Sequence, residues 1–479
     1  MPKCIIDGQE VEFSAGENLV EVAKKIGIEI PVFCYHPGLS VVAQCRMCTV
    51  EVEKMGKLQT GCSTVATEGM VVHTQSEKVK KNRESVMEFL LINHPLDCPI
   101  CDKSGECDLQ DHSFDHGSSY MRTTESRRTY LDLDMGPVIK KNMNRCIHCT
   151  RCIRLGEEVT HIREMVALQR GNNTEISTID GRALETDYAA NYADVCPTGS
   201  LTLKDFRFNK RVWMLKKTPT ICEGCSRGCN MEAHWDAGQV HRCIPRENLE
   251  INRYWLCDEG RFNFHYTHDE TRIIQPQLRS GGVLSDATWN EALEGSKNKI
   301  KGKSCVFLIG SDLTQEEVEV IKGFVNKSFQ NAPMFHFGTP NVKTSAQDTD
   351  EDKILKRTSK TSNLNGLEKL GLKAFDTVPS GVEYLVIFKG GRAQLPQGVD
   401  QFKKVGFGVF FENEKTAFDV IFPGATFLEK SGTVLNYQNK EQKFNRAIPP
   451  PKTCKYFSEV FMLWDNVKQN KSEHSMGVA

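Results

Sequence analysis

The sequence has no long apolar run and no excess of either charge. Its longest apolar stretches, such as residues 89–92 and 405–411, fall far short of the roughly 18–20 residues that a membrane-spanning helix needs. No basic segment followed by an apolar one opens the chain, so we expect no secretory or organellar targeting signal. Lys and Arg number 61 against 62 Asp and Glu, which gives no support for a nucleic-acid partner.

A dinucleotide-binding glycine motif is also missing. Gly390-Gly391 is followed by Arg392-Ala393, which does not fit the G-x-G-x-x-G pattern that follows a strand. We therefore expect neither NAD nor FMN to bind to this chain. With 479 residues, the chain is long enough for several domains of roughly 100–200 residues each.

Cysteine, in contrast, is abundant and unevenly placed. Of the 19 cysteines, only Cys305 and Cys454 follow Cys257. In a reducing compartment, cysteines in tight Cys-x-x-Cys spacing hold metal more often than they form disulfides. The uneven placement predicts metal sites that are confined to the first part of the chain.

Fifteen cysteines and one histidine fall into four sets. In chain order, the first set is Cys34, Cys45, Cys48 and Cys62; the second is His94, Cys98, Cys101 and Cys107; the third is Cys146, Cys149, Cys152 and Cys196; the fourth is Cys222, Cys225, Cys229 and Cys257. The other cysteines are predicted to be small buried apolar residues: Cys4, Cys243, Cys305 and Cys454.

Spacing indicates iron–sulfur chemistry most clearly in the third set. Its Cys-x2-Cys-x2-Cys run and a later Cys196-Pro197 match the bacterial ferredoxin pattern of a [4Fe–4S] site, with an insertion before the last cysteine. The first set shares the x2 pair of a plant-type [2Fe–2S] loop but has a longer first gap. By spacing alone, the first and fourth sets also suit structural zinc. Arg145, Arg151 and Arg154 could stabilise a reduced cluster or form a solvated face.

The second set has three cysteines and needs a fourth ligand. His94 lies just upstream of them, and a neutral imidazole ligand tends to raise the potential of a cluster. The alternative is that His94 only ends a helix. Four adjacent sets are unusual for separate zinc sites, whereas closely placed one-electron centres suit a protein that carries electrons.

Local patterns predict an N-terminal ferredoxin-like module. Asp7-Gly8 is a turn dipeptide that predicts a hairpin between residues 3–6 and 11–13. A helix is expected over residues 77–93. Its buried side is expected to carry Val79, Val86, Phe89 and Leu90.

The C-terminal part has the pattern of an α/β domain. Thr314 and Glu317 form a capping box for a helix that should present Val318, Ile321 and Val325 to a sheet. Residues 339–363 are polar and predicted to form an exposed loop or insertion. Dense apolar runs predict strands buried on both faces of a parallel sheet at residues 304–309, 334–337, 384–388, 407–411 and 419–422.

Several of these motifs together resemble a known family. They are residues 34–62, the stretch His94-Pro-Leu-Asp-Cys98-Pro-Ile-Cys101-Asp-Lys-Ser-Gly-Glu-Cys107, the run Arg145-Cys-Ile-His-Cys-Thr-Arg-Cys-Ile-Arg154, and Cys196-Pro-Thr-Gly199. The segment from Cys4 to about Tyr266 resembles the large iron–sulfur subunit of respiratory complex I, also called the G or 75 kDa subunit of NADH:quinone oxidoreductase. The resemblance implies a [2Fe–2S] cluster on the first set and [4Fe–4S] clusters on the second and third, with His94 as a ligand.

The fourth set and the C-terminal part resemble a wider superfamily. The fourth set is similar to an extra [4Fe–4S] site of some bacterial members and to the cluster domain of molybdopterin-dependent oxidoreductases, which implies two or three [4Fe–4S] clusters in all. Residues 287–293, 418–423 and 429–433, with Asn436, also resemble that superfamily. A shortened structural domain without molybdenum is expected.

The expected fold is therefore α+β ferredoxin-like (β-grasp) iron–sulfur domains followed by an α/β domain that resembles a truncated molybdopterin-oxidoreductase domain. The predicted domains are 1–76 ([2Fe–2S]), 77–118 ([4Fe–4S] with one histidine and three cysteines), 119–210 (ferredoxin-like [4Fe–4S]), 211–270 (molybdopterin-oxidoreductase-type [4Fe–4S]) and 271–479 (degenerate α/β).

The resemblance implies an electron-transfer subunit that relays electrons from the flavin of a partner subunit towards quinone, with no catalytic residue of its own. Its implied partners are the other peripheral-arm subunits, including the NADH/FMN-binding and quinone-side subunits. It would be peripheral, on the cytoplasmic side of the bacterial inner membrane, and held there through its partners. The alternatives are a subunit of an NAD-linked formate dehydrogenase or hydrogenase, and a zinc-stabilised scaffold.

Overall fold

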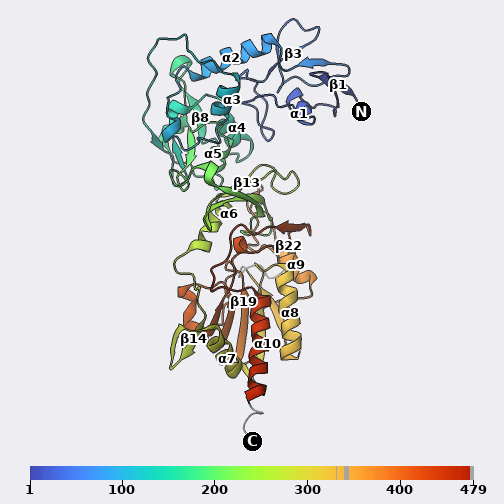
Figure 1. Cartoon of the computed structure of the whole chain (residues 1–479), viewed down its shortest axis with the longest axis vertical. Coiled ribbons are helices and arrows are strands. Elements are labelled where there is room, and N and C mark those ends of the chain that lie inside the picture. Colours follow the sequence, from blue (N-terminus) through green and yellow to red (C-terminus); the bar gives the residue numbers. More distant parts are fainter. Residues whose placement is uncertain (331, 339–344, 475–479) are drawn as a thin grey trace. The chain divides into compact units, whose positions relative to one another are not determined.

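The chain folds into two compact units, Met1–Met214 and Leu215–Ala479. The structure is a computed structural model that describes residues 1–330, 332–338 and 345–474. In Figure 1, the first unit runs from blue to green, and the second runs from green to red. Each unit has its own sheets and its own buried core.

Unit 1 begins with a mixed sheet in the order β2-β1-β5-β3-β4. The predicted hairpin is confirmed, with β1 and β2 antiparallel around Asp7-Gly8. Helix α1 packs its Leu19, Val22 and Ala23 into the core of this sheet. The elements are β1 (Lys3–Ile6), β2 (Gln9–Glu12), α1 (Leu19–Lys24), β3 (Thr49–Val52), β4 (Gln59–Thr60) and β5 (Val71–His73).

Helix α2 (Glu77–Leu91) confirms the predicted second helix, but its buried face differs from the expected one. Its buried residues are Val79, Arg83 and Met87, which recur every four positions. The expectation for Phe89 is wrong, because this side chain is 74% exposed. Phe89 lies two positions beyond Met87, and residues two apart do not share a helix face.

The rest of unit 1 consists of short elements joined by long loops. Two small sheets have the orders β10-β7-β6 and β8-β9. The elements are α3 (Asp108–His116), β6 (Leu133–Asp134), β7 (Ile139–Lys141), α4 (Arg151–Glu158), β8 (Met165–Leu168), β9 (Glu175–Thr178), α5 (Asn191–Val195) and β10 (Leu201–Leu203).

Unit 2 is built around a large sheet in the order β15-β14-β21-β20-β19-β16-β17-β18. Smaller sheets pair β11-β12-β13 and β22-β23. The strands are β11 (Lys216–Ile221), β12 (Asn230–Asp236), β13 (Gln239–Pro245), β14 (Gln277–Ser280), β15 (Val283–Asp286), β16 (Cys305–Gly310), β17 (Met334–Phe337), β18 (Lys373–Ala374), β19 (Tyr384–Lys389), β20 (Lys403–Gly408), β21 (Phe418–Pro423), β22 (Gly432–Leu435) and β23 (Glu441–Phe444).

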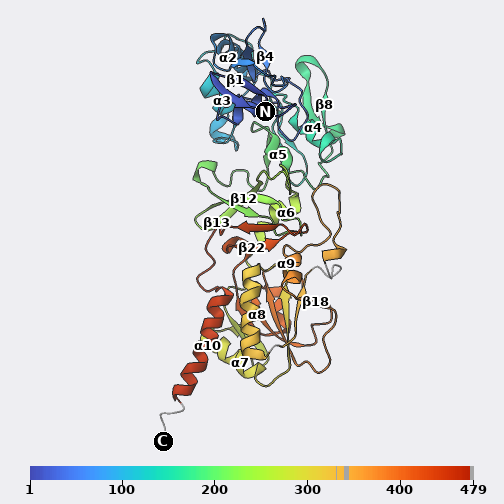
Figure 2. The same cartoon turned by 90° about the vertical axis from the view of Figure 1, so that its right-hand side faces the viewer.

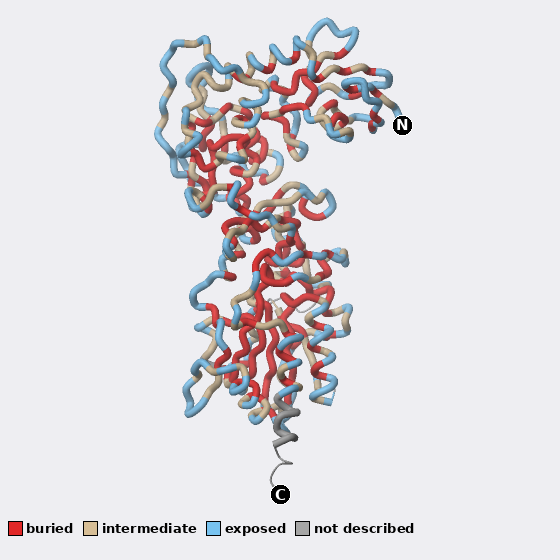
Figure 3. The backbone as a smooth tube through the Cα atoms, viewed as in Figure 1, coloured by how far each residue is buried: buried red, intermediate tan, exposed pale blue. Residues whose placement is uncertain are grey.

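The parallel sheet predicted for the C-terminal part is confirmed. Strands β17, β16, β19, β20 and β21 pair in parallel, and both β16 and β19 are buried along their whole length, as the red strands in Figure 3 show. One boundary is wrong, because the strand expected at residues 407–411 is β20, which ends at Gly408.

Helices cover one face of this sheet, as Figure 2 shows. They are α7 (Trp289–Ile300), α8 (Gln315–Phe329) and α10 (Phe457–His474). Unit 2 also contains the short helices α6 (Asp258–Phe262) and α9 (Leu364–Lys369). The capping box at Thr314 and the burial of Val318, Ile321 and Val325 are confirmed. Within the described residues, no helix combines the length and apolar character needed to cross a membrane.

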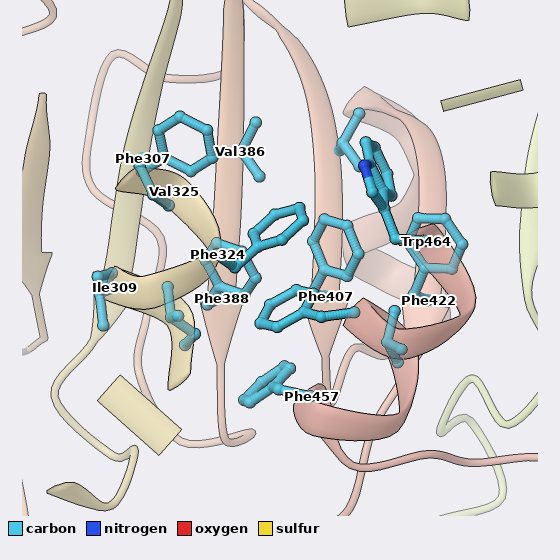
Figure 4. Close-up of a cluster of buried hydrophobic side chains, with 14 of the residues drawn as sticks. Phe307, Ile309, Phe324, Val325, Val386, Phe388, Phe407, Phe422, Phe457 and Trp464 are labelled. Atoms are coloured by element: carbon cyan, nitrogen blue, oxygen red, sulfur yellow. The ribbon is translucent and has the colours of Figure 1, made fainter. Parts of the chain in front are cut away.

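The core beneath these helices is rich in aromatic rings (Figure 4). Phe407 stacks on Phe388 with centroids 5.0 Å apart and on Phe422 at 4.6 Å. Phe324 of α8 stacks on Phe461 of α10 at 3.9 Å. These contacts tie both helices and three strands into one apolar layer.

Candidate iron–sulfur sites

The first set lies in the loop between α1 and β3 and in the turn after β4. The thiols of Cys45 and Cys62 hydrogen-bond to Cys34 and hold its pKa far below the usual value, and Cys62 also contacts Cys48. Cys34, Cys48 and Cys62 are each 1% exposed. The structure therefore brings all four predicted residues together.

Two residues of this loop adopt left-handed backbone angles, Ala43 with φ 49° and Arg46 with φ 64°. Such angles are uncommon for residues other than glycine and concentrate where a loop must aim groups at a site. Arg46 lies between Cys45 and Cys48, so the turn there directs both thiols to the same side as Cys34.

In the second set, three of the four predicted residues share a cavity. His94, Cys98 and Cys107 line a space of about 400 Å³ that begins where α2 ends. Cys107 is the N-cap of α3. Cys101 does not line this cavity: a Cβ built on Gly199 would lie 2.2 Å from its Sγ. The prediction that all four gather at one place is thus met only in part by the structure.

His94 has the chemical state that a metal ligand needs. Burial, followed by the charge of Arg145, lowers its pKa to about 4, so the imidazole is neutral at neutral pH. Its Nδ1 is buried without a hydrogen-bond partner. Arg145 itself pairs with Asp97, with Nη2 and Oδ2 2.9 Å apart.

The third set gathers completely. One hollow is lined by all four of its cysteines, Cys146, Cys149, Cys152 and Cys196. Burial first, and then the charge of neighbouring thiols, raises the pKa of Cys146 to about 12 and that of Cys149 to about 11. Left-handed angles at His148 (φ 54°) and Thr150 (φ 60°) turn the chain between the cysteines, and α4 then begins at Arg151.

The fourth set joins the end of β11 to the start of α6. The backbone N–H of Cys222 donates to the carbonyl of Cys229 at 2.7 Å, and Cys257 is the N-cap of α6. The charges of Cys222, Cys225 and Cys257 all act on Cys229, whose pKa is raised first by burial. A Cβ on Gly260 would lie 2.7 Å from the Sγ of Cys222, so only glycine fits beside the thiols.

A polar segment that was expected to be exposed instead covers this fourth set. The carbonyl of Ser359 accepts from the N–H of Ser226 at 2.9 Å, and Lys360 pairs with Glu259 at 2.9 Å. Ser359 and Asn363 are 0% exposed. The expectation is therefore wrong for residues 359–363, because long-range contacts hold Ser359 and Lys360 against the fourth set. Residues 339–344 lie outside the described part.

In unit 1, one apolar cluster joins the three cysteine sets. It consists of Phe33, Cys34, Met47, Met87, Cys107, Leu109, Ile147 and Cys149, with Cys45 packed against it. Cys34 belongs to the first set, Cys107 to the second and Cys149 to the third. Cys107 also donates to the carbonyl of Pro197 beside Cys196, at 3.7 Å.

Buried arginines fasten the first set to the third. Nη2 of Arg154 donates to the carbonyls of Cys34 at 2.6 Å and Cys149 at 3.3 Å. Nη2 of Arg151 donates to the carbonyl of Tyr35 at 2.5 Å. Both side chains are buried, so the alternative of a solvated face is wrong. Spacing alone did not reveal that these arginines span two sets.

Donor chemistry fits all four sets to iron–sulfur clusters, and the cysteines of the first, third and fourth sets are also buried or partly buried and lie close together. Iron binds thiolate, so a cluster would take the place of the proton on each thiol that is protonated. Among residues 1–330, 332–338 and 345–474, no three His, Cys, Asp or Glu side chains gather closely enough for a single metal ion. The leftover cysteines behave as predicted, since all of them are buried: Cys4, Cys243, Cys305 and Cys454.

Models of protein families match five segments of the chain. Residues 3–77 match a 2Fe-2S iron–sulfur cluster binding domain, and residues 83–122 match the NADH-ubiquinone oxidoreductase-G iron–sulfur binding region. Residues 136–202 match the ferredoxin-like domain of NADH-quinone oxidoreductase subunit 3. Residues 215–269 match the molybdopterin oxidoreductase Fe4S4 domain, and residues 408–462 match molybdopterin oxidoreductase.

Curated relatives share a large part of the sequence. The G subunit of NADH-quinone oxidoreductase from Rickettsia bellii is 42% identical over 330 residues, which is 68% of this chain and 48% of the relative. This chain is a homologue of that G subunit. The NADH-ubiquinone oxidoreductase 75 kDa subunit of Reclinomonas americana is 36% identical over 359 residues, 74% of this chain and 52% of that subunit. The chain thus spans about half the length of the curated relatives it matches.

Among solved structures, one chain from the crystal structure of an NAD+-reducing [NiFe]-hydrogenase in the H2-reduced state is 28% identical, with a TM-score of 0.40. The match covers 44% of the present chain and 91% of the hydrogenase chain. The predicted family resemblance is confirmed by the relatives and family models, as is the order of iron–sulfur domains before a molybdopterin-oxidoreductase-like domain.

Proposed function

We propose that this chain is an electron-transfer subunit of a proton-translocating NADH:quinone oxidoreductase. The observation that carries the proposal is the shared apolar cluster of unit 1, which holds cysteines from three ligand sets in one core. A protein that passes single electrons needs its centres close together and away from water. Homology to the G subunit supplies the reaction in which such a chain takes part.

The proposed ligands are the four predicted sets. Cys34, Cys45, Cys48 and Cys62 hold a [2Fe–2S] cluster; His94, Cys98, Cys101 and Cys107 hold a [4Fe–4S] cluster; Cys146, Cys149, Cys152 and Cys196 hold another; Cys222, Cys225, Cys229 and Cys257 hold a third [4Fe–4S] cluster. When bound, these groups accept and release one electron at a time. Cys101 would have to join His94, Cys98 and Cys107 at their cavity to complete the second set.

The protein's own residues position these centres and exclude water from them. Arg154 and Arg151 hold the loop of the first set against the helix that carries Cys152. Cys98 is the exposed member of the second set, while the cysteines of the first, third and fourth sets are buried or partly buried. No side chain acts as acid, base or nucleophile, and the chain binds neither NAD, FMN nor molybdenum.

The proposed partners are the other peripheral-arm subunits, including the NADH/FMN-binding and quinone-side subunits. The chain is peripheral, on the cytoplasmic side of the bacterial inner membrane, and contacts the membrane through those subunits. The proposed division of the chain into domains follows the sequence prediction: 1–76, 77–118, 119–210, 211–270 and 271–479.

Electron paramagnetic resonance of the dithionite-reduced protein tests the proposal. We expect one binuclear signal and at least two tetranuclear signals. His94→Ala should alter one tetranuclear signal only, because His94 belongs to one set. Cys243→Ser is the matched control, since Cys243 is buried in unit 2 outside every set, and it should alter none. Absence of a binuclear signal from the wild-type protein contradicts the proposal.

Metal analysis separates the alternative functions. Stoichiometric molybdenum in anaerobically purified protein would support a formate dehydrogenase subunit instead. Zinc at the four sets, with iron and acid-labile sulfide near zero, would support a structural scaffold. We expect iron and sulfide in nearly equal amounts.

A further inference from the structure

Arg83 is a buried cation in the middle of α2. Its side chain is 0% exposed, and it is among the largest fully buried side chains of the protein. Nη2 donates to the carbonyl of Thr49 at 3.1 Å, whereas Nε and Nη1 are buried without a hydrogen-bond partner. In the described part of the chain, no carboxylate forms an ion pair with Arg83. Burial of an unpaired charge is costly, so an anion nearby is expected.

The other buried arginines of unit 1 make more hydrogen bonds or ion pairs than Arg83 does. Arg145 pairs with Asp97, and Arg151 and Arg154 each donate to two or more backbone carbonyls. Arg83 has a single acceptor. Arg83 leaves both Nε and Nη1 without a partner, whereas Arg151 and Arg154 leave only Nε, so the shortage of acceptors is greatest at Arg83.

The groups around Arg83 place it beside the first cysteine set. Its acceptor Thr49 directly follows Cys48, and the strongest attractive charge on Arg83 is that of Cys48. The next is Asp7, whose carboxylate is already engaged by the N–H and hydroxyl of Thr74. His116 of α3 also faces Arg83. Burial lowers the pKa of Arg83 to about 10, so the guanidinium stays charged at neutral pH.

We propose that Arg83 is the counter-charge of the [2Fe–2S] cluster on the first set and raises the reduction potential of that cluster. The inference rests on the proposed function, because it needs a cluster at Cys34, Cys45, Cys48 and Cys62. Two ferric ions, two sulfides and four thiolates together carry two negative charges. One electron from a reductant adds a third without a proton. A fixed cation nearby stabilises the more negative form more strongly.

The test is a potentiometric titration of the holoprotein in which the electron paramagnetic resonance signal of the binuclear centre is monitored. Arg83→Met removes the charge and keeps an unbranched side chain, while Arg83→Lys keeps the charge. Lys81→Met is the matched control, because Lys81 lies exposed on the same helix and solvent screens its charge. The tetranuclear signals of the same samples serve as internal references.

We expect Arg83→Met to lower the equilibrium constant for reduction of the binuclear centre at least tenfold, which for one electron is a shift of about 59 mV to more negative potential. Arg83→Lys should recover most of this change, and Lys81→Met should leave the potential unchanged. The tetranuclear signals should stay in place in all variants. An unchanged binuclear potential in Arg83→Met, or equal potentials in Arg83→Met and Arg83→Lys, would overturn the inference.

The remaining outcomes are also decisive. Loss of the binuclear signal in Arg83→Met but not in Arg83→Lys supports a need for positive charge. Loss in both variants overturns the inference, since the shape and hydrogen bond of arginine would then be what matters. Absence of a binuclear signal from the wild-type protein would instead refute the proposed function.

Discussion

The two units bury their cysteine sets in different ways. In unit 1, three sets share an apolar cluster to which the cysteines themselves contribute, and Cys48 and Cys62 also belong to the core of the five-stranded sheet. In unit 2, the single set lies on a small antiparallel sheet, while the largest core is a separate aromatic layer on the parallel sheet. The contrast indicates that ligand residues are part of the core in unit 1, whereas the main core of unit 2 is independent of them.

Removal of iron should produce the largest difference between the units. A chelator under reducing conditions should unfold most of unit 1, because metal binding supplies folding free energy where the cysteine side chains form part of the core. Strands β16, β19, β20 and β21 should keep their protection in hydrogen exchange read by mass spectrometry. Equal loss of protection in both units would show that the parallel sheet also depends on the metal sites.

A cavity in the aromatic layer should instead destabilise unit 2 and leave unit 1 unaffected. Phe407→Ala should destabilise unit 2 by about 3–5 kcal/mol, because it removes stacking on Phe388 and Phe422 and leaves a void. The change in the free energy of unfolding is measured by chemical denaturation with tryptophan fluorescence as the signal, since Trp464 lies in the same core. The iron content of unit 1 should be unaffected, and Phe407→Leu should cost less than Phe407→Ala.

The arginine that joins two sets offers a test within unit 1. Arg154→Leu should destabilise this unit by about 2 kcal/mol, since charged donors to the carbonyls of Cys34 and Cys149 are lost. The change can be followed as loss of the binuclear signal at a lower denaturant concentration than in the wild-type protein. Arg163→Leu is the control: Arg163 is 77% exposed in its pair with Glu157, and its loss should have little effect. Similar effects of both variants would argue against the joining role of Arg154.

The smallest expected effect concerns the start of α8. Thr314→Ala should cost about 1 kcal/mol, because the hydroxyl of Thr314 accepts from the N–H of Glu317 in a capping box. The free energy of unfolding of unit 2 is the measurement. Thr314→Ser keeps the hydroxyl and should restore the wild-type value; if serine and alanine behave alike, the cap contributes nothing.

Local patterns predicted much of the fold. The hairpin at Asp7-Gly8 and the helix that begins after Thr314 depend on residues a few positions apart, so short motifs suffice to predict them. The buried face of α2 was harder, because Phe89 is apolar yet exposed and Arg83 is charged yet buried. Burial there is decided by what packs against the helix, which its own sequence does not contain.

Some features of the candidate sites could likewise be predicted from local sequence, and others could not. Cys-x-x-Cys spacing indicated where the cysteine sets lie, whereas His94 as a ligand was implied only by the family resemblance. Spacing also did not predict that Cys101 lies apart from the cavity that Cys98 and Cys107 line. The cover over the fourth set by residues 359–363 could not be predicted from a polar stretch whose partners lie more than a hundred residues away. Polar residues are usually exposed, and only distant acceptors such as these allow their burial.

The sequence by itself determined which thiols lie in metal-ligand spacing, because residue type and spacing are local properties that do not depend on the arrangement of the surrounding chain. Only the tertiary structure decided how these sets are connected. It placed Arg154 between Cys34 and Cys149, brought Cys107 into the same apolar cluster, and left Arg83 buried beside Cys48 with too few acceptors. Such contacts join residues far apart in the chain, so they exist only once the chain has folded.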